Sequence, residues 1–226
     1  ENKTSAVPVI YTEVSTGRYT AEGAVLQGYH KSVRYSALGG CYEYDLEAAH
    51  QNILLQLLEQ KGVDFPALET MREYVFNKQE TRVRLSKELN TSISIVKEVI
   101  NLLTYGGRLS RDKRYCELYQ VCNEDANLLE RVVSNKWFKR YSKAFNESHK
   151  RLVGKSINIR NAVGIDKEVR ARKKGKALAH ILQGCERQVL DAVIKHSNRD
   201  DIALLVHDCV VFYNRQSPEE LSRIVL

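Results

Sequence analysis

Apolar and polar residues alternate along one short segment that leads directly into a helix-like pattern. Residues 41–46 alternate with a period of two behind the Gly39-Gly40 pair, which predicts a strand. Leucines and an isoleucine then recur at helical spacing over residues 48–59. Asp45 is therefore expected at a junction between a strand and a helix.

A second aspartate lies in an apolar segment near the end of the chain. Residues 202–213 are expected to form a strand, a turn and a strand, with His207-Asp208 at the tip. Burying an unpaired carboxylate is costly, which favours a functional role for Asp208. The alternative is an ordinary turn aspartate that bonds to its own backbone.

Most of the remaining chain has the pattern of helices separated by glycine or polar breaks. Thr91 or Ser92 can cap a helix that runs to about Thr104, and Gly106-Gly107 ends it. The other expected elements are helices at 65–89, two helices within 108–152 that meet near Ser134-Asn135, helices at 177–196 and from Ser217 onward, and small strands or irregular structure at 7–35.

Two features have both a structural and a functional interpretation. The first is a stripe of aromatic residues at near-helical spacing, which consists of Trp137, Phe138, Tyr141 and Phe145. Such a stripe is typical of a core, and the alternative is a surface on which nucleic-acid bases stack. Basic residues concentrate between 167 and 176, which indicates either a solvated face or a contact with nucleic acid.

Composition adds a bias toward an acidic partner. The 226 residues carry a net charge of +7, and the pI is about 9.1. Clustered cations bind a phosphate backbone by releasing counterions, so nucleic acid is favoured, although a basic balance also serves solubility.

The sequence also indicates a reducing compartment. Its five cysteines are odd in number and lack metal-binding spacing. No apolar run is long enough to span a bilayer, and the amino terminus lacks a signal-peptide pattern. We expect a cytoplasmic protein without a membrane partner. The chain opens without methionine and stops inside a helical pattern, which suggests an excised piece.

The candidate chemistry is metal-dependent transfer of nucleotides. On the helix ending at Thr104, Lys97, Asn101 and Tyr105 share one face because positions i, i+4 and i+8 align. That face could meet a nucleotide from triphosphate to base. Two divalent ions about 3.5–4 Å apart stabilise phosphoryl transfer, and oxygen ligands such as Asp45 and Asp208 suit Mg²⁺ or Mn²⁺.

These motifs, in this order, resemble the single-subunit polymerases, namely A-family DNA polymerases and phage-type or mitochondrial RNA polymerases. The resemblance covers residues 17–213 and includes an aspartate ending a strand (Asp45), a lysine followed after seven residues by Tyr105-Gly106, and His-Asp in a hairpin turn. The first motif, Asp-Leu-x-x-x-His followed by an apolar helix, is similar to that of the compact polymerases of transposons, viruses and phages.

The resemblance implies an α+β right-hand polymerase core. A small antiparallel palm sheet would come from residues 1–59 and 176–226, large helical fingers from 60–175, and the thumb would be reduced or absent. The implied activity is that of a DNA-directed nucleotidyltransferase, either a DNA polymerase or primase or an RNA polymerase, in replication, priming or transcription of a phage or mobile element. The implied partners are a DNA template, nucleoside triphosphates and further polymerase domains or subunits such as a helicase or single-strand binding protein.

The resemblance also assigns roles to individual residues. Asp45, Leu46 and Asp208 would hold two Mg²⁺ or Mn²⁺ ions. The implied nucleotide-binding residues are Lys97, Asn101, Tyr105, Gly106 and His50. The implied nucleic-acid contacts are Arg18, Gln27, Arg34, Gln183, Arg187, His207, Arg172, Lys173 and Lys174.

Two departures from the family pattern change the expectations. The family usually has an arginine where this chain has Ile93, so the triphosphate would need another cation, and the candidates are Arg82, Arg84 and Arg108. His50 stands where DNA-making members have a glutamate that excludes the ribose hydroxyl, which leaves the choice of sugar open. The alternatives to a polymerase are a catalytically silent nucleic-acid-binding subunit and a two-metal nuclease.

Overall fold

The computed structural model describes residues 9–15, 18–23, 26–113, 117–154, 158–168, 174–206 and 209–225. The chain divides into two units, each described below by itself. Unit 1 comprises Glu1–Leu46, Asn161–Ile165 and Gln183–Leu226, and unit 2 comprises Glu47–Arg160 and Asp166–Leu182. Helices and small antiparallel sheets together confirm the expected α+β class.

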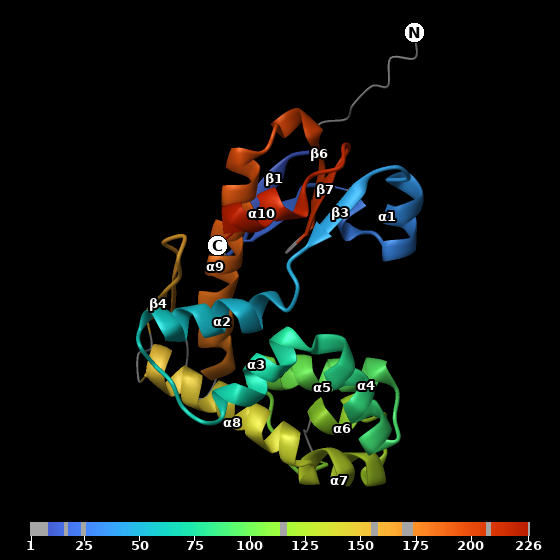
Figure 1. The fold of residues 1–226 in the computed structure, drawn as a ribbon, viewed down its shortest axis with the longest axis vertical. Coiled ribbons are helices and arrows are strands. Elements are labelled where there is room, and N and C mark those ends of the chain that lie inside the picture. Colours follow the sequence, from blue (N-terminus) through green and yellow to red (C-terminus); the bar gives the residue numbers. More distant parts are fainter. Residues whose placement is uncertain are drawn as a thin grey trace. The chain divides into compact units, whose positions relative to one another are not determined.

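A three-stranded antiparallel sheet forms the centre of unit 1 (Figure 1). Its order is β3 (Tyr42–Asp45), β7 (Cys209–Phe212) and β6 (Ile202–Val206). The strands that the sequence predicted at 41–46 and 202–213 are confirmed. Asp45 is the register partner of Cys209, and Val206 is also paired with Cys209.

The two faces of this sheet pack against different partners because side chains alternate along each strand. One face buries Leu205, Val210 and Phe212 against the C-terminal part of α9 (Lys174–His196) and α10 (Pro218–Val225). The other face buries Leu204, Val206, Cys209 and Val211, which pack against Leu26 and Leu38. Leu26 begins the 3-10 helix η1 (Leu26–Gly28), and Leu38 ends the helix α1 (Lys31–Ala37).

Two ion pairs join the paired strands β1 (Tyr11–Glu13) and β2 (Tyr19–Ala21) to α9. The arginine belongs to the strand segment in one pair and to α9 in the other. Arg18 donates to Glu186 of α9 at 2.7 Å, and Arg187 of α9 donates to Glu13 at 3.4 Å. Glu186 is 1% exposed, so its carboxylate is buried beside the guanidinium. A buried pair of this kind fixes a relative position because either charge alone would be costly there.

Unit 2 is mainly helical. Its helices are α2 (Ala49–Gln60), α3 (Leu68–Phe76), α4 (Lys78–Leu89), α5 (Ile93–Thr104), α6 (Glu117–Val121), α7 (Ala126–Ser134), α8 (Lys136–Leu152) and the start of α9. The strands β4 (Asn158–Arg160) and β5 (Asp166–Glu168) form a separate antiparallel pair that the sequence did not predict. The helical segment expected at 65–89 is confirmed, and it forms two helices that meet where the backbone leaves the helical path at Asn77.

Side-chain caps explain where several of these helices begin. The hydroxyl of Ser92 accepts a hydrogen bond from the backbone amide of Ile95, which starts α5 where the sequence predicted it. Asn135 accepts from the amides of Trp137 and Phe138 and starts α8, which confirms the predicted break at this position.

The aromatic stripe of α8 is core. Phe138 and Tyr141 are fully buried, and Trp137 stacks on Tyr141 with ring centroids 4.8 Å apart. The hydroxyl of Tyr141 bonds to Thr104 and Gln51, and burial raises the pKa of Tyr141 far above its usual value. The packing interpretation is therefore confirmed for this stripe, and stacking of bases on it is excluded by burial.

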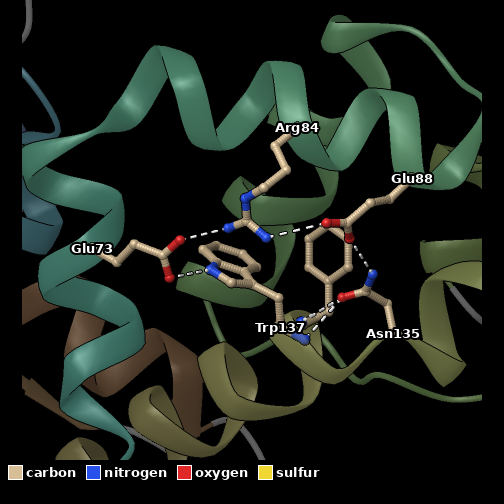
Figure 2. A network of polar contacts seen from close by, with 6 residues as sticks. Glu73, Arg84, Glu88, Asn135 and Trp137 are labelled. Atoms are coloured by element: carbon tan, nitrogen blue, oxygen red, sulfur yellow. Dashed lines mark hydrogen bonds and ion pairs between the residues drawn. The ribbon is translucent and has the colours of Figure 1, made fainter.

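A polar network closes the outer side of this core (Figure 2). Glu73 of α3 accepts from the indole nitrogen of Trp137 at 3.0 Å and from the guanidinium of Arg84. Arg84 also donates to Glu88 at 3.2 Å, and Asn135 donates to the same carboxylate at 3.1 Å. The network links α3, α4 and α8, because each polar group in it forms a hydrogen bond with a group from another position in the network.

Gly184 allows the loop 161–165 to contact α9 closely. A Cβ at this position would lie 2.7 Å from Cβ of Asn161 and 2.9 Å from the amide nitrogen of Ala162. The loop is rigid in its own right because the side chain of Asn161 accepts from the amide of Ile165 at 2.9 Å. Neither neighbour can therefore give way easily.

We predict that Gly184→Ala destabilises the protein. Overpacking costs about 1–3 kcal/mol, and the better helix propensity of alanine offsets up to about 1 kcal/mol. Urea denaturation measures the difference. The control is Gly28→Ala, where no atom lies within 4 Å of the added Cβ. Equal midpoints for the two variants would contradict the prediction.

We predict that Arg18→Met lowers the free energy of unfolding by about 3 kcal/mol, because Glu186 loses its buried cationic partner. The double variant Arg18→Met/Glu186→Leu should recover most of that loss. As a control, Arg160→Met removes an exposed pair with Asp166 and should change stability by less than about 1 kcal/mol. If the double variant is no more stable than the single one, the ion pair does not hold β1 and β2 on α9.

Candidate functional site

Asp45 ends the edge strand β3 and is exposed. Its side chain shares a sheet face with Glu43, because the two are separated by one residue. Its register partner Cys209 directly follows Asp208 in the sequence. His207 and Asp208 themselves lie outside the described residues, so their predicted roles stay predictions.

Carboxylate oxygens are the donors available on this face. Asp45 and Glu43 fit a hard divalent ion, which needs one or two carboxylates and completes its shell with water and phosphate oxygens. Among the residues that the structure describes, there is no cluster of three or more His, Cys, Asp or Glu side chains placed to hold a metal. Asp208, the second acid of the predicted pair, lies outside those residues.

The ammonium of Lys31 interacts electrostatically with these acids. Hydrogen bonding to Tyr35 raises the pKa of Lys31 above its usual value, and the carboxylates of Glu43 and Asp45 contribute in the same direction. Lys31 therefore stays charged on the side of the sheet that carries Asp45.

In unit 2, one face of α5 is exposed as predicted. Lys97 and Asn101 are exposed, whereas Val96 and Ile100 on the opposite side are buried. Tyr105 caps the helix and is 45% exposed. The lysine and the tyrosine are thus available to a ligand of this unit.

The structure brings together His50 and Tyr105, two residues that the sequence assigned to nucleotide binding. Their rings meet edge to face with centroids 5.4 Å apart, and His50 is 5% exposed. The pair places an imidazole beside the phenol, where the family resemblance implied a carboxylate.

The backbone at the start of α9 packs directly against the Tyr105-Gly106 turn. Gly106 has φ +81°, which favours glycine, and a Cβ on it would lie 2.8 Å from Cα of Gly175. A Cβ on Gly175 would lie 1.9 Å from the carbonyl oxygen of Tyr105. Only two glycines permit this backbone contact.

Two of the three cations proposed to replace the missing fingers arginine are committed elsewhere. Arg82 is buried and donates to the hydroxyl of Tyr74 at 3.0 Å, while Arg84 belongs to the Glu73 and Glu88 network. A guanidinium that is already bound within the protein is a weaker candidate for contact with a triphosphate. Arg108 is exposed and stays a candidate.

Several predicted nucleic-acid contacts have structural partners. Arg18 is bound to Glu186 as described above, and Gln27 is buried, with its amide bonded to Ala21, Tyr19 and Leu205. Arg187 donates to Asp191 at 2.8 Å, and its guanidinium lies 3.4 Å from the ring centroid of Tyr19. These groups order unit 1, and any ligand would have to use their remaining donors.

The other predicted contacts are more accessible or lie outside the described part. Arg34 is half-buried and donates to the carbonyl of Tyr29 at 3.1 Å. Gln183 is half-buried on α9. Arg172 and Lys173 precede the described part of α9, and the side chain of Lys174 is likewise not described.

Glu186 was not predicted as the partner of Arg18. A signal was present, because Glu186 lies four residues after Leu182 and four before Leu190, on the apolar side of an amphipathic helix. A charge at such a position indicates a buried ion pair, although the distant arginine cannot be identified from spacing.

A comparison with solved structures finds a similar fold. The POL domain of Pol1 from M. smegmatis, in complex with DNA primer-template and dNTP, matches with a TM-score of 0.57 and 17% sequence identity. The match covers 96% of this chain and 43% of that chain, so this chain spans less than half of that structure's length. No family model and no curated protein matches the sequence. The chain thus has a fold similar to that of a DNA polymerase domain.

Proposed function

We propose that the chain is part of a template-directed nucleic-acid polymerase and joins nucleotides by two-metal phosphoryl transfer. The observation that carries the proposal is the register of β3 on β7, which pairs Asp45 with the residue that follows Asp208. From this register we infer that Asp208, which follows Asp45 by 163 positions in the sequence, would lie near Asp45. The similarity in fold to a polymerase domain supports the same interpretation.

Within this proposal, the palm would consist of most of unit 1 together with α2 and most of the start of α9, and the other helices of unit 2 would form the fingers. The proposed limits are 1–59 and 176–226 for the palm and 60–175 for the fingers. The small antiparallel sheet and the long helical segment between its strands support that division.

The metal site would consist of Asp45, Leu46 and Asp208. Bound Mg²⁺ or Mn²⁺ would neutralise charge that develops on the transferred phosphoryl group. Asp45 contributes an exposed carboxylate from the end of a hydrogen-bonded strand, so the sheet fixes its backbone before any ligand arrives.

The nucleotide would be bound by the exposed face of α5. Lys97 supplies a point charge for the triphosphate, and Asn101 and Tyr105 continue the same face toward the sugar and base. Gly106 ends the helix, and His50 supports the ring of Tyr105. In the DNA-making polymerases that the chain resembles, a glutamate at the position of His50 excludes the ribose hydroxyl, so this proposal leaves the choice of sugar open.

The remaining partners follow from the same proposal. The M. smegmatis structure contained DNA primer-template and dNTP. For this chain we propose a DNA template, nucleoside triphosphates, and further domains or subunits that supply the parts of a polymerase it lacks. In the residues that the structure describes, no helix has the length and apolar character needed to cross a membrane.

The central prediction concerns the two acids. Asp45→Asn and Asp208→Asn should each abolish primer extension with Mg²⁺ or Mn²⁺, because the neutral amide no longer balances the ions' charge, while binding of primed template should stay within about twofold. The matched control is Asp200→Asn, an exposed aspartate of unit 1 outside the site, which should keep full activity.

The assay should offer ribo- and deoxynucleotides separately, with and without primer, and include candidate partner subunits. Full extension by either Asp45 or Asp208 variant would refute the metal assignment. Persistent binding of template without any incorporation by the unmodified protein would instead identify a silent nucleic-acid-binding subunit. Degradation of the template in the absence of nucleotides would indicate a nuclease.

A further prediction tests the fingers lysine. Lys97→Met should lower kcat/KM for the nucleotide by about a hundredfold, since a cation on the triphosphate is lost. Lys87→Met, an exposed lysine on α4, serves as the control and should leave kcat/KM unchanged. Equal effects of the two substitutions would show that Lys97 contributes only general charge.

A further inference from the structure

The short helix α1 has a surface that packing does not explain. None of its residues is buried, and Tyr35 is 50% exposed. The ammonium of Lys31 lies 4.9 Å from the ring centroid of Tyr35, one turn along the same side of the helix. Arg34 lies next to Tyr35 and is oriented by its hydrogen bond to the carbonyl of Tyr29. Lys31, Arg34 and Tyr35 are called the α1 surface below.

Exposed aromatic side chains concentrate in this part of the chain. Single exposed apolar residues are normal on any surface. Among the described residues, however, three of the six exposed aromatic side chains lie within residues 29–42. The other three are Phe76, Tyr105 and Tyr213. Exposed aromatic side chains are therefore more frequent around the α1 surface than in the rest of the described residues.

The charge around the α1 surface favours an anionic ligand. Residues 23–42 contain no aspartate or glutamate but include His30, Lys31 and Arg34. Glu43 and Asp45 follow directly, so the basic stretch ends where the acidic strand β3 begins. A ligand with phosphates would meet the cations of α1 and be kept away from the Glu43 side unless a cation is bound there.

A hollow connects the α1 surface to the sheet face that carries Asp45. Its volume is about 60 Å³. Arg34 and Tyr35 lie on its α1 side, and Glu43 and Cys209 lie on its sheet side. Cys209 is the register partner of Asp45. The hollow is too small for a nucleoside, so a base would pack on the exposed ring of Tyr35 and not inside the hollow.

We propose that the α1 surface binds a single nucleic-acid strand on its way to Asp45, with a base stacked on Tyr35 and phosphates on Lys31 and Arg34. The proposal rests on the proposed function and names the surface that would receive the strand. Tyrosine rings with neighbouring cations bind single strands without regard to sequence, because every base has a face to stack. A duplex keeps its bases stacked on each other and would leave the ring unused.

The test measures binding and requires no catalysis. Fluorescence anisotropy of a labelled oligothymidylate is followed with EDTA present and without nucleotides. Tyr35→Ala should weaken binding about tenfold, whereas Tyr35→Phe should bind like the unmodified protein because it retains the ring. Tyr213→Ala and Phe76→Ala remove other exposed rings and should have no effect.

The salt dependence provides a second readout. Lys31→Met and Arg34→Met should each reduce the slope of log affinity against log salt by about 0.7, the value for one phosphate contact on a single strand. Lys136→Met, an exposed lysine of unit 2, controls for net charge and should leave the slope unchanged. Circular dichroism of each variant checks that the fold is intact.

The outcomes separate this proposal from the proposed function. Equal binding by Tyr35→Ala and the unmodified protein, or equal losses in Tyr35→Ala and Tyr213→Ala, would overturn the α1 surface even if the chain extends primers. Tyr35-dependent binding with no extension under any condition would support the α1 surface and reject the polymerase. A preference for duplex that ignores Tyr35 would also count against the proposal.

Discussion

The pairing of β3 with β7 is the constraint on which the candidate chemistry depends. Backbone hydrogen bonds hold Asp45 opposite Cys209, and an antiparallel register cannot shift by one residue without moving every side chain to the other face. The buried side chains on both faces of the sheet therefore specify the position of Asp45 as well as the fold of unit 1. A one-residue slip of β3 would remove Tyr44 from the apolar cluster around Val210 and Phe212 and place the charged Glu43 there, which is unfavourable.

Local patterns predicted the strands and most helices because their causes are local. Alternation at 41–46, the Ser92 cap and the Asn135 break all act within a few residues, and each is found in the structure. The split at Asn77 was not predicted, because no glycine or proline marks it. The pair β4 and β5 was also missed, since three-residue strands lack enough positions to show a period.

Partners that are distant in sequence could not be predicted in the same way. His50 could be assigned a role by resemblance, but its ring contact with Tyr105 depends on how α2 and α5 pack. The backbone contact of Gly106 with Gly175 joins residues that no periodicity relates. The aromatic stripe of α8 was interpreted correctly from spacing, because apolar residues that recur on one side of a helix usually face a core.

The net charge of the sequence overstates the charge that a ligand can use. Guanidinium groups form several directed hydrogen bonds, and many of those that the structure describes are used within the protein. The arginines bound to side chains of their own unit include Arg18, Arg72, Arg82, Arg84, Arg111, Arg160 and Arg187. Lysine forms weaker directional contacts and loses more hydration on burial, and both Lys31 and Lys97 are exposed. Phosphate binding in this protein should therefore depend mainly on lysines, which attract a phosphate without fixing its orientation. Contacts of the bases with Tyr35 and Tyr105 would then have to orient the bound ligand. This division explains why a basic composition alone indicated an acidic partner but could not indicate where it binds.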